Sequence, residues 1–134
     1  MAYEIALLIG RILFGGYFAF SGLNHFMSSD QLSGWVESKG FPAPDVLVYG
    51  SGLMLLAGGL GIAAGAYPVI SVLLAGVFLV AVTPTFHDFW NFEGEEKQNH
   101  MVNFQKNVAL LGALLMSLSL NWSVYAAGMS LGLL

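Results

Sequence analysis

The feature that most constrains this chain is a long uncharged stretch in its middle. No Asp, Glu, Lys or Arg occurs between Val46 and Phe86. This stretch divides into two apolar segments, 46–65 and 68–86, each about 20 residues long, which is the length a helix needs to cross a bilayer. Only 9% of the 134 residues are charged and 57% are hydrophobic, whereas roughly a quarter of the residues in a soluble domain are charged. The sequence therefore predicts a membrane protein.

Two further apolar segments predict two more membrane spans. The first, 3–27, lacks the basic start of a cleavable signal peptide, so we expect it to be retained. The other, 101–122, follows a polar run and continues into a helical C-terminal extension, 123–134. We therefore expect an all-α membrane protein with a single domain, residues 1–134, in which four transmembrane helices form an antiparallel bundle.

The segment 29–39 between the first two spans has the pattern of a short helix. Ser28 and Asp30 can cap its start, and Gly40 marks its end. Its Trp35 is of the type that anchors a helix at the depth of the lipid headgroups. We expect this helix to lie at the membrane interface.

Small residues recur at every fourth position in two of the spans. They are Gly15 and Ala19 in the first span, and Ala57, Gly61 and Gly65 in the second. Small side chains on one face allow helix backbones to approach closely in lipid. We expect these five residues to form helix-packing faces.

The distribution of basic residues predicts the orientation in the plasma membrane. Four spans place both termini on one side and the loops 28–45 and 87–100 on the other. Three of the four basic residues lie toward the loop side, and only Arg11 lies toward the termini. By the positive-inside rule, we expect these two loops to be cytoplasmic.

The three histidines, His25, His87 and His100, each begin or end a span on the loop side. Three imidazoles can bind zinc or another transition metal, and two can hold a haem iron, with Asp88 as a further ligand or a supporting carboxylate. The alternative is that these histidines cap helices or form hydrogen bonds with loops.

A polar strip on the fourth span is the second candidate site. His100, Asn103 and Asn107 share one helix face, with Lys106 beside them. Together with His25 and His87, this strip could hold a quinone headgroup or a small anion, since charged residues inside spans are often functional. The alternative is hydrogen bonding between helices, with Lys106 extending to the interface.

Arg11 lies about two turns inside the first span, on the same helix face as Glu4. It can extend toward the membrane surface on the side of the termini. The alternative is that it contacts an anion or a quinone on the side opposite the histidines.

Several classes of function are excluded or disfavoured by the residues present. The net charge of −4 provides no basic surface for nucleic acid. The absence of cysteine excludes disulfides, thiolate-ligated metals and a catalytic thiol. The chain also has no nucleophile elbow, phosphate-binding loop or dinucleotide fingerprint.

Four short motifs resemble the DoxX family of small membrane proteins. They are Ser-Gly-Leu-Asn-His-Phe at 21–26, Gly-Phe-Pro-Ala-Pro at 40–44, His-Asp-Phe-Trp at 87–90 and Asn-Phe-Gln-Lys-Asn at 103–107. The resemblance implies a four-helix integral membrane protein. The family name derives from a subunit associated with thiosulfate:quinone oxidoreductase activity, so the resemblance also implies a link to quinone or electron-transport chemistry.

The leading hypothesis is an accessory or anchoring subunit of a larger membrane complex, rather than an enzyme acting alone. The expected partners are the lipid bilayer and either other subunits or further copies of the chain. One alternative is a redox or ligand-binding protein that uses the polar site at one membrane face. A second alternative is an oligomeric carrier of small solutes.

Overall fold

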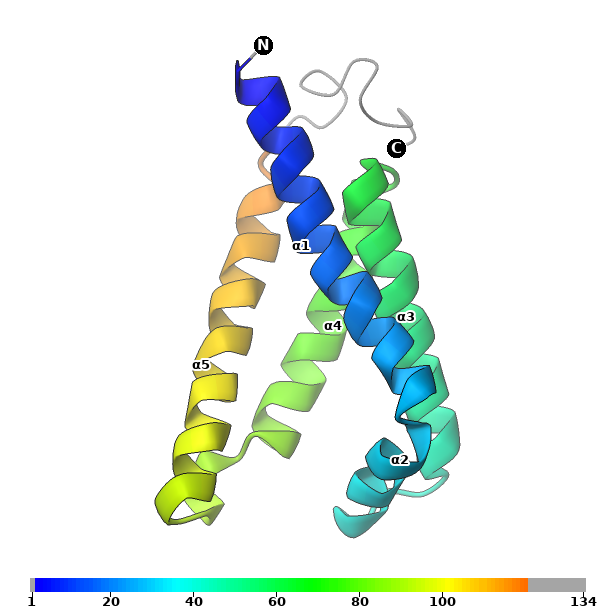
Figure 1. The fold of residues 1–134 in the computed structure, drawn as a ribbon, viewed down its shortest axis with the longest axis vertical. Coiled ribbons are helices and arrows are strands. Elements are labelled where there is room, and N and C mark those ends of the chain that lie inside the picture. The colour runs from blue at the N-terminus through cyan, green and yellow to red at the C-terminus, as the bar shows by residue number, and fades with distance from the viewer. Residues whose placement is uncertain (1, 121–134) are drawn as a thin grey trace.

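The structure is a computed structural model that describes residues 2–120. These residues form helices and no strands (Figure 1). The elements are α1 (Ala2–Met27), α2 (Ser29–Ser38), α3 (Pro44–Ala64), α4 (Pro68–Phe86), the 3₁₀ helix η1 (Phe89–Asn91) and α5 (Gly94–Ser117).

The first, second and third predicted spans agree with α1, α3 and α4 to within two residues. Within residues 2–120, three helical segments are long and apolar enough to cross a membrane. They are Ala2–Met27, Pro44–Ala64 and Pro68–Asn91. A helix also occupies the segment predicted to lie at the interface, and it ends at Ser38. Its depth in the membrane remains a prediction.

The helix that contains the predicted fourth span, α5, begins at Gly94, seven residues before the predicted start of that span at 101. The polar residues before 101 form the first turns of this helix. Glu95 and Glu96 lie in its first turn, where a negative charge interacts favourably with the helix dipole. α5 is not among the three candidate spans, so a fourth span remains a prediction. Residues 121–122 and the extension 123–134 lie outside the described residues.

The helices α1 and α3 pack backbone against backbone. A side chain at Gly15 would collide with the backbone of Gly59 and Ala63, and one at Gly59 would collide with Gly15 and Ala19. A Cβ atom added at Gly22 would lie 2.6 Å from the carbonyl oxygen of Gly52 on α3. Only glycine therefore fits at these crossing points.

The other small residues singled out in the sequence have different positions. Gly61 faces α4, where an added side chain would collide with Ser71. Gly65 ends α3 in the left-handed conformation, with φ of 68°. Ala57 lies on the exposed side of α3, so it is outside the contact with α1.

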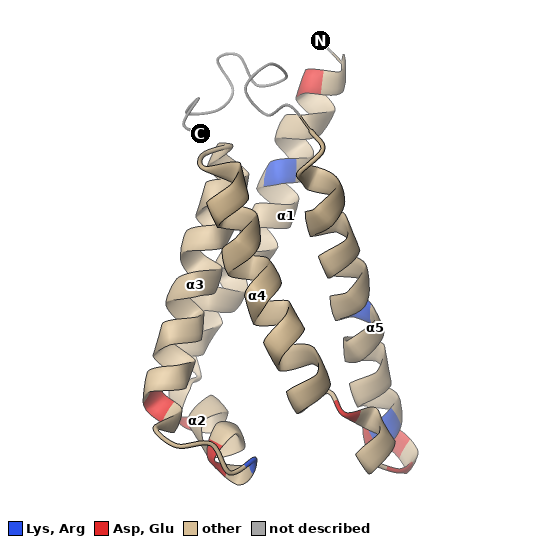
Figure 2. Cartoon of the chain, turned by 180° about the vertical axis from the view of Figure 1, so that it is seen from behind, with Lys and Arg blue, Asp and Glu red and all other residues tan. Residues whose placement is uncertain are grey.

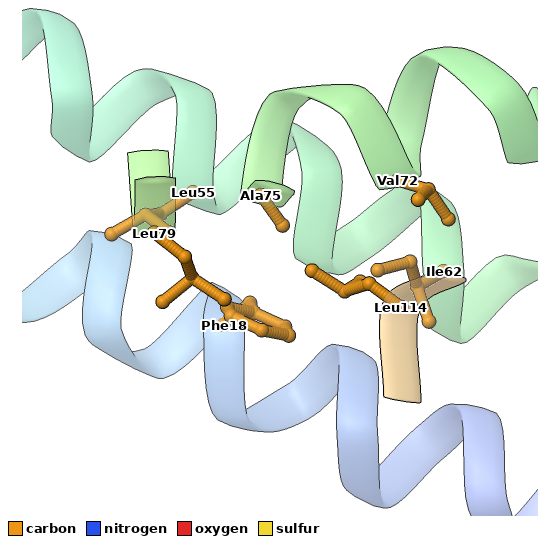
Figure 3. Packing of buried hydrophobic residues seen from close by; sticks show 7 residues of the cluster. All are labelled: Phe18, Leu55, Ile62, Val72, Ala75, Leu79 and Leu114. Carbon is orange, nitrogen blue, oxygen red and sulfur yellow. The ribbon is translucent and has the colours of Figure 1, made fainter. Parts of the chain in front are cut away.

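The hydrophobic core lies where four helices meet (Figure 3). Its buried members are Phe18 from α1, Leu55 and Ile62 from α3, Val72, Ala75 and Leu79 from α4, and Leu114 from α5. The contacts of α5 are mainly with α4 and η1. The charged residues gather mostly at the end of the molecule where α2 and η1 lie (Figure 2).

Replacing Gly59 by Leu should destabilise the fold, because the new side chain would meet backbone atoms that cannot rotate away. We expect the free energy of unfolding in mixed micelles to fall by at least about 1–3 kcal/mol. Gly16→Leu is the matched control on α1, because no atom lies within 4 Å of a Cβ added there. Denaturant titration followed by circular dichroism measures both variants. If Gly59→Leu and Gly16→Leu lost equal stability, the close contact between α1 and α3 would contribute no more to stability than an open position on α1.

Candidate functional site

Side chains from α2, α4 and α5 meet at the loop end of the molecule. We call this group the loop-end cluster. Its members are Trp35 of α2, Lys39 directly after α2, His87 and Asp88 directly after α4, and His100 of α5. Of these five, the sequence singled out His87, Asp88 and His100 as candidate site residues.

An ion pair joins α2 to the end of α4. Lys39 Nζ donates a hydrogen bond to Asp88 Oδ1 at 2.9 Å. The other oxygen, Oδ2, accepts a hydrogen bond from Asn91 Nδ2 at 2.8 Å. Asp88 is only 8% exposed. Both carboxylate oxygens are therefore occupied, and the residue fixes the position of α2 rather than facing a ligand.

His87 and His100 lie side by side, with their Nδ1 atoms 3.3 Å apart. A hydrogen bond between them requires one Nδ1 to donate and the other to accept, so the bond cannot form when both rings are protonated. Aromatic rings border the pair. Phe92 stacks on His100 with the ring centroids 4.3 Å apart, and Trp35 contacts both histidines.

His25 is separate from this pair. Its Nδ1 lies 2.8 Å from the carbonyl oxygen of Ser21. A carbonyl oxygen can only accept, so Nδ1 carries the hydrogen. The ring packs edge-on against Phe78 of α4. Within residues 2–120, no group of three or more His, Asp or Glu side chains could hold a metal ion. The structure thus brings together two of the three histidines, and the three-histidine metal site and the haem site remain predictions.

The polar strip of α5 forms mainly local contacts. Asn103 Nδ2 donates to the carbonyl oxygen of Asn99 at 2.9 Å. Lys106 Nζ donates to Asn103 Oδ1 at 3.2 Å and lies over the ring of Tyr17 on α1. Asn107 is buried. Of the strip, His100 alone joins the loop-end cluster.

Arg11 lies in the first half of α1, toward the end opposite the cluster. It is only 3% exposed. With Gly10, Phe14 and Ser117, it lines a pocket of about 230 Å³ between α1 and α5. Whether an anion or a quinone binds at this pocket remains a prediction.

A groove of about 340 Å³ runs between α3 and α4. Its walls are apolar apart from Ser51 and Thr85. At the loop end it is bordered by Phe41 and Phe86, which stack with their centroids 6.1 Å apart. The ring of Phe86 also contacts Trp35 edge-on at 5.0 Å. The groove therefore ends beside the loop-end cluster.

Sequence reasoning did not identify this groove, nor the roles of Trp35 and Lys39. Trp35 packs on Phe86 and the two histidines, and its expected position among the lipid headgroups remains a prediction. The one sign of these roles in the sequence is that Trp35 and Lys39 are four positions apart, and therefore lie on one face of the predicted helix. The pattern does not say whether that face meets lipid or protein.

Removing the charge of Asp88 should loosen α2. We expect Asp88→Asn to lower the free energy of unfolding by about 1.5–3 kcal/mol, because hydrogen bonds to charged groups contribute this much. Denaturant titration of Asp88→Asn, Lys39→Met and the double variant measures the coupling between the two residues. Asp30→Asn is the control, because Asp30 is exposed on α2. Full additivity of the two single substitutions would contradict the ion pair.

Comparison with known proteins identifies the family. The model of the DoxX family matches residues 6–88, which is more than half of the chain. The match covers most of α1, all of α2 to α4 and every member of the loop-end cluster except His100. No curated protein and no solved structure was found to match. With its apolar helices and its match over most of the helical bundle, the chain belongs to the DoxX family of membrane proteins.

Proposed function

We propose that this chain is an accessory subunit of a membrane complex and that it holds a quinone in the groove between α3 and α4. The observation that supports this proposal is the groove itself. Its walls are apolar, and it also carries the aromatic rings of Phe41 and Phe86 and the hydroxyl groups of Ser51 and Thr85. The resemblance of the motifs to the DoxX family supplies the link to quinones.

The apolar part of the groove suits an isoprenoid tail. Its walls include Leu47 and Met54 of α3 and Val77 and Val82 of α4. Leu47 and Val77 are 44% and 54% exposed, so the groove is open along its side. A ligand dissolved in the bilayer could therefore enter laterally, without crossing an aqueous phase.

The loop end of the groove suits the ring of a quinone. Phe41 and Phe86 offer aromatic surfaces for stacking. The hydroxyls of Ser51 and Thr85 donate to carbonyl oxygens of their own helices, which leaves their lone pairs to accept hydrogen bonds. Such acceptors fit the hydroxyl groups of the reduced form. When bound, a quinone would supply two-electron redox chemistry.

The accessory role rests on the surface of α1 and α5. Gly10 and Gly16 of α1 and Gly112 of α5 have no atom within 4 Å of an added Cβ. Open glycines of this kind let the backbone of another helix approach closely in lipid. We place the protein in the plasma membrane, with the loops 28–45 and 87–100 facing the cytoplasm, where a redox subunit could contact the loop-end cluster.

Filling the groove should weaken quinone binding. We expect Val82→Phe to raise the Kd for decylubiquinone at least tenfold, which corresponds to about 1.4 kcal/mol. Val80→Phe is the matched control, because Val80 lies on the same helix but lines a different groove, between α4 and α5. Quenching of tryptophan fluorescence in the purified protein would measure both. Unchanged affinity in Val82→Phe, with wild-type binding intact, would exclude this groove as the site.

Isolation of the protein from its native membranes in a mild detergent tests the accessory role. Mass spectrometry of the intact particle should show this chain together with larger redox subunits and a bound quinone. A particle that contains only copies of this chain would contradict the accessory role while leaving the quinone site to the binding assay.

A further inference from the structure

We propose that His87 and His100 form a binding site for a divalent transition-metal ion, with one imidazole nitrogen supplied by each residue. This site lies at the loop end, outside the groove, and does not depend on quinone binding. The metals that fit are those that favour imidazole ligands, namely Cu²⁺, Ni²⁺ and Zn²⁺.

The spacing of the two nitrogens is the first argument. The Nδ1 atoms are 3.3 Å apart, which is at the long end of hydrogen-bond distances. Two nitrogens that each lie about 2.0–2.1 Å from a tetrahedral ion are separated by about 3.3–3.4 Å. A tetrahedral Zn²⁺ ion could therefore bind to both Nδ1 atoms without a change in their separation, and a tetragonal Cu²⁺ ion would need the two nitrogens to approach to about 2.8 Å.

The second argument is that both rings are held in place before any ion binds. Phe92 stacks on the face of His100, and Trp35 packs against both imidazoles. The backbone N–H of His87 donates to the carbonyl oxygen of Thr83 at 3.1 Å. Little side-chain freedom would be lost on binding, which favours affinity.

The surrounding charges are the third argument. Lys106 and Lys39 both act on His87 and would repel a cation, but Lys39 is paired with Asp88 at 2.9 Å. Asp88 also makes a hydrogen bond with Asn91, so it acts as a neighbouring carboxylate rather than a ligand. Both histidines remain partly exposed. The remaining coordination positions are thus left to water or to a group on a partner molecule.

The number of ligands sets the expected strength. Within residues 2–120, no third His, Asp or Glu completes the site. A site with two protein ligands binds more weakly than a four-ligand structural zinc site. Cu²⁺ is the most sensitive probe, because it binds nitrogen ligands most tightly among these ions.

The test uses the full chain, purified in detergent and stripped of metal with a chelator, and titrated with Cu²⁺. Electron paramagnetic resonance of the wild-type protein should show coupling to two imidazole nitrogens at one equivalent. We expect His87→Ala and His100→Ala each to raise the Kd for Cu²⁺ at least tenfold. His25→Ala is the matched control, because its ring is bonded within its own helix, and it should leave the affinity unchanged.

Three results would overturn the proposal. They are a wild-type spectrum without two nitrogen ligands, loss of binding in His25→Ala equal to that in His87→Ala, and Zn²⁺ leaving the wild-type melting temperature unchanged. The spectrum and the Zn²⁺ shift use the wild-type protein, so misfolding of a variant does not affect them. Val82→Phe should retain Cu²⁺ binding, which separates this site from the quinone groove.

Discussion

The contact between the backbones of α1 and α3 is the interaction on which the rest of the structure depends. In lipid, no hydrophobic effect drives one helix against another, so close packing must supply the attraction. Gly15, Gly22 and Gly59 bring the two backbones together over much of their length. This contact fixes the two ends of α2, which connects α1 to α3. Ser33 then holds α2 in place by donating a hydrogen bond to Asp45 at 2.6 Å.

The apolar segments could be located from the sequence because the length of a membrane span is set by the bilayer. The start of α5 could not be located in this way. Its first turns carry Glu95 and Glu96, and a polar composition does not distinguish a loop from a solvated helical turn. The acidic residues were themselves the signal that a helix begins there.

The sequence predicted at which end of the molecule the candidate site lies, but it did not predict which histidines meet there. The order of spans places all three histidines near the same end, and the structure pairs His87 with His100. The rotation of each helix about its axis decides which rings meet, and the sequence pattern does not fix that rotation. The same reason explains Ala57, which follows the four-residue spacing and yet faces away from α1.

The loop-end cluster and the groove share an aromatic wall. Trp35 contacts both histidines of the cluster and also Phe86 of the groove. The ion pair between Lys39 and Asp88 sets the distance between α2 and the end of α4. The position of α2 therefore determines the shape of both the loop-end cluster and the groove.

The connection between α3 and α4 bears on how the protein enters the membrane. It consists of Gly65, Ala66 and Tyr67, and it carries no charge. Moving this turn across the bilayer transfers no ionised group through the hydrocarbon, so the main energetic barrier to translocating a loop is absent. The two helices can therefore insert together as a hairpin, already paired.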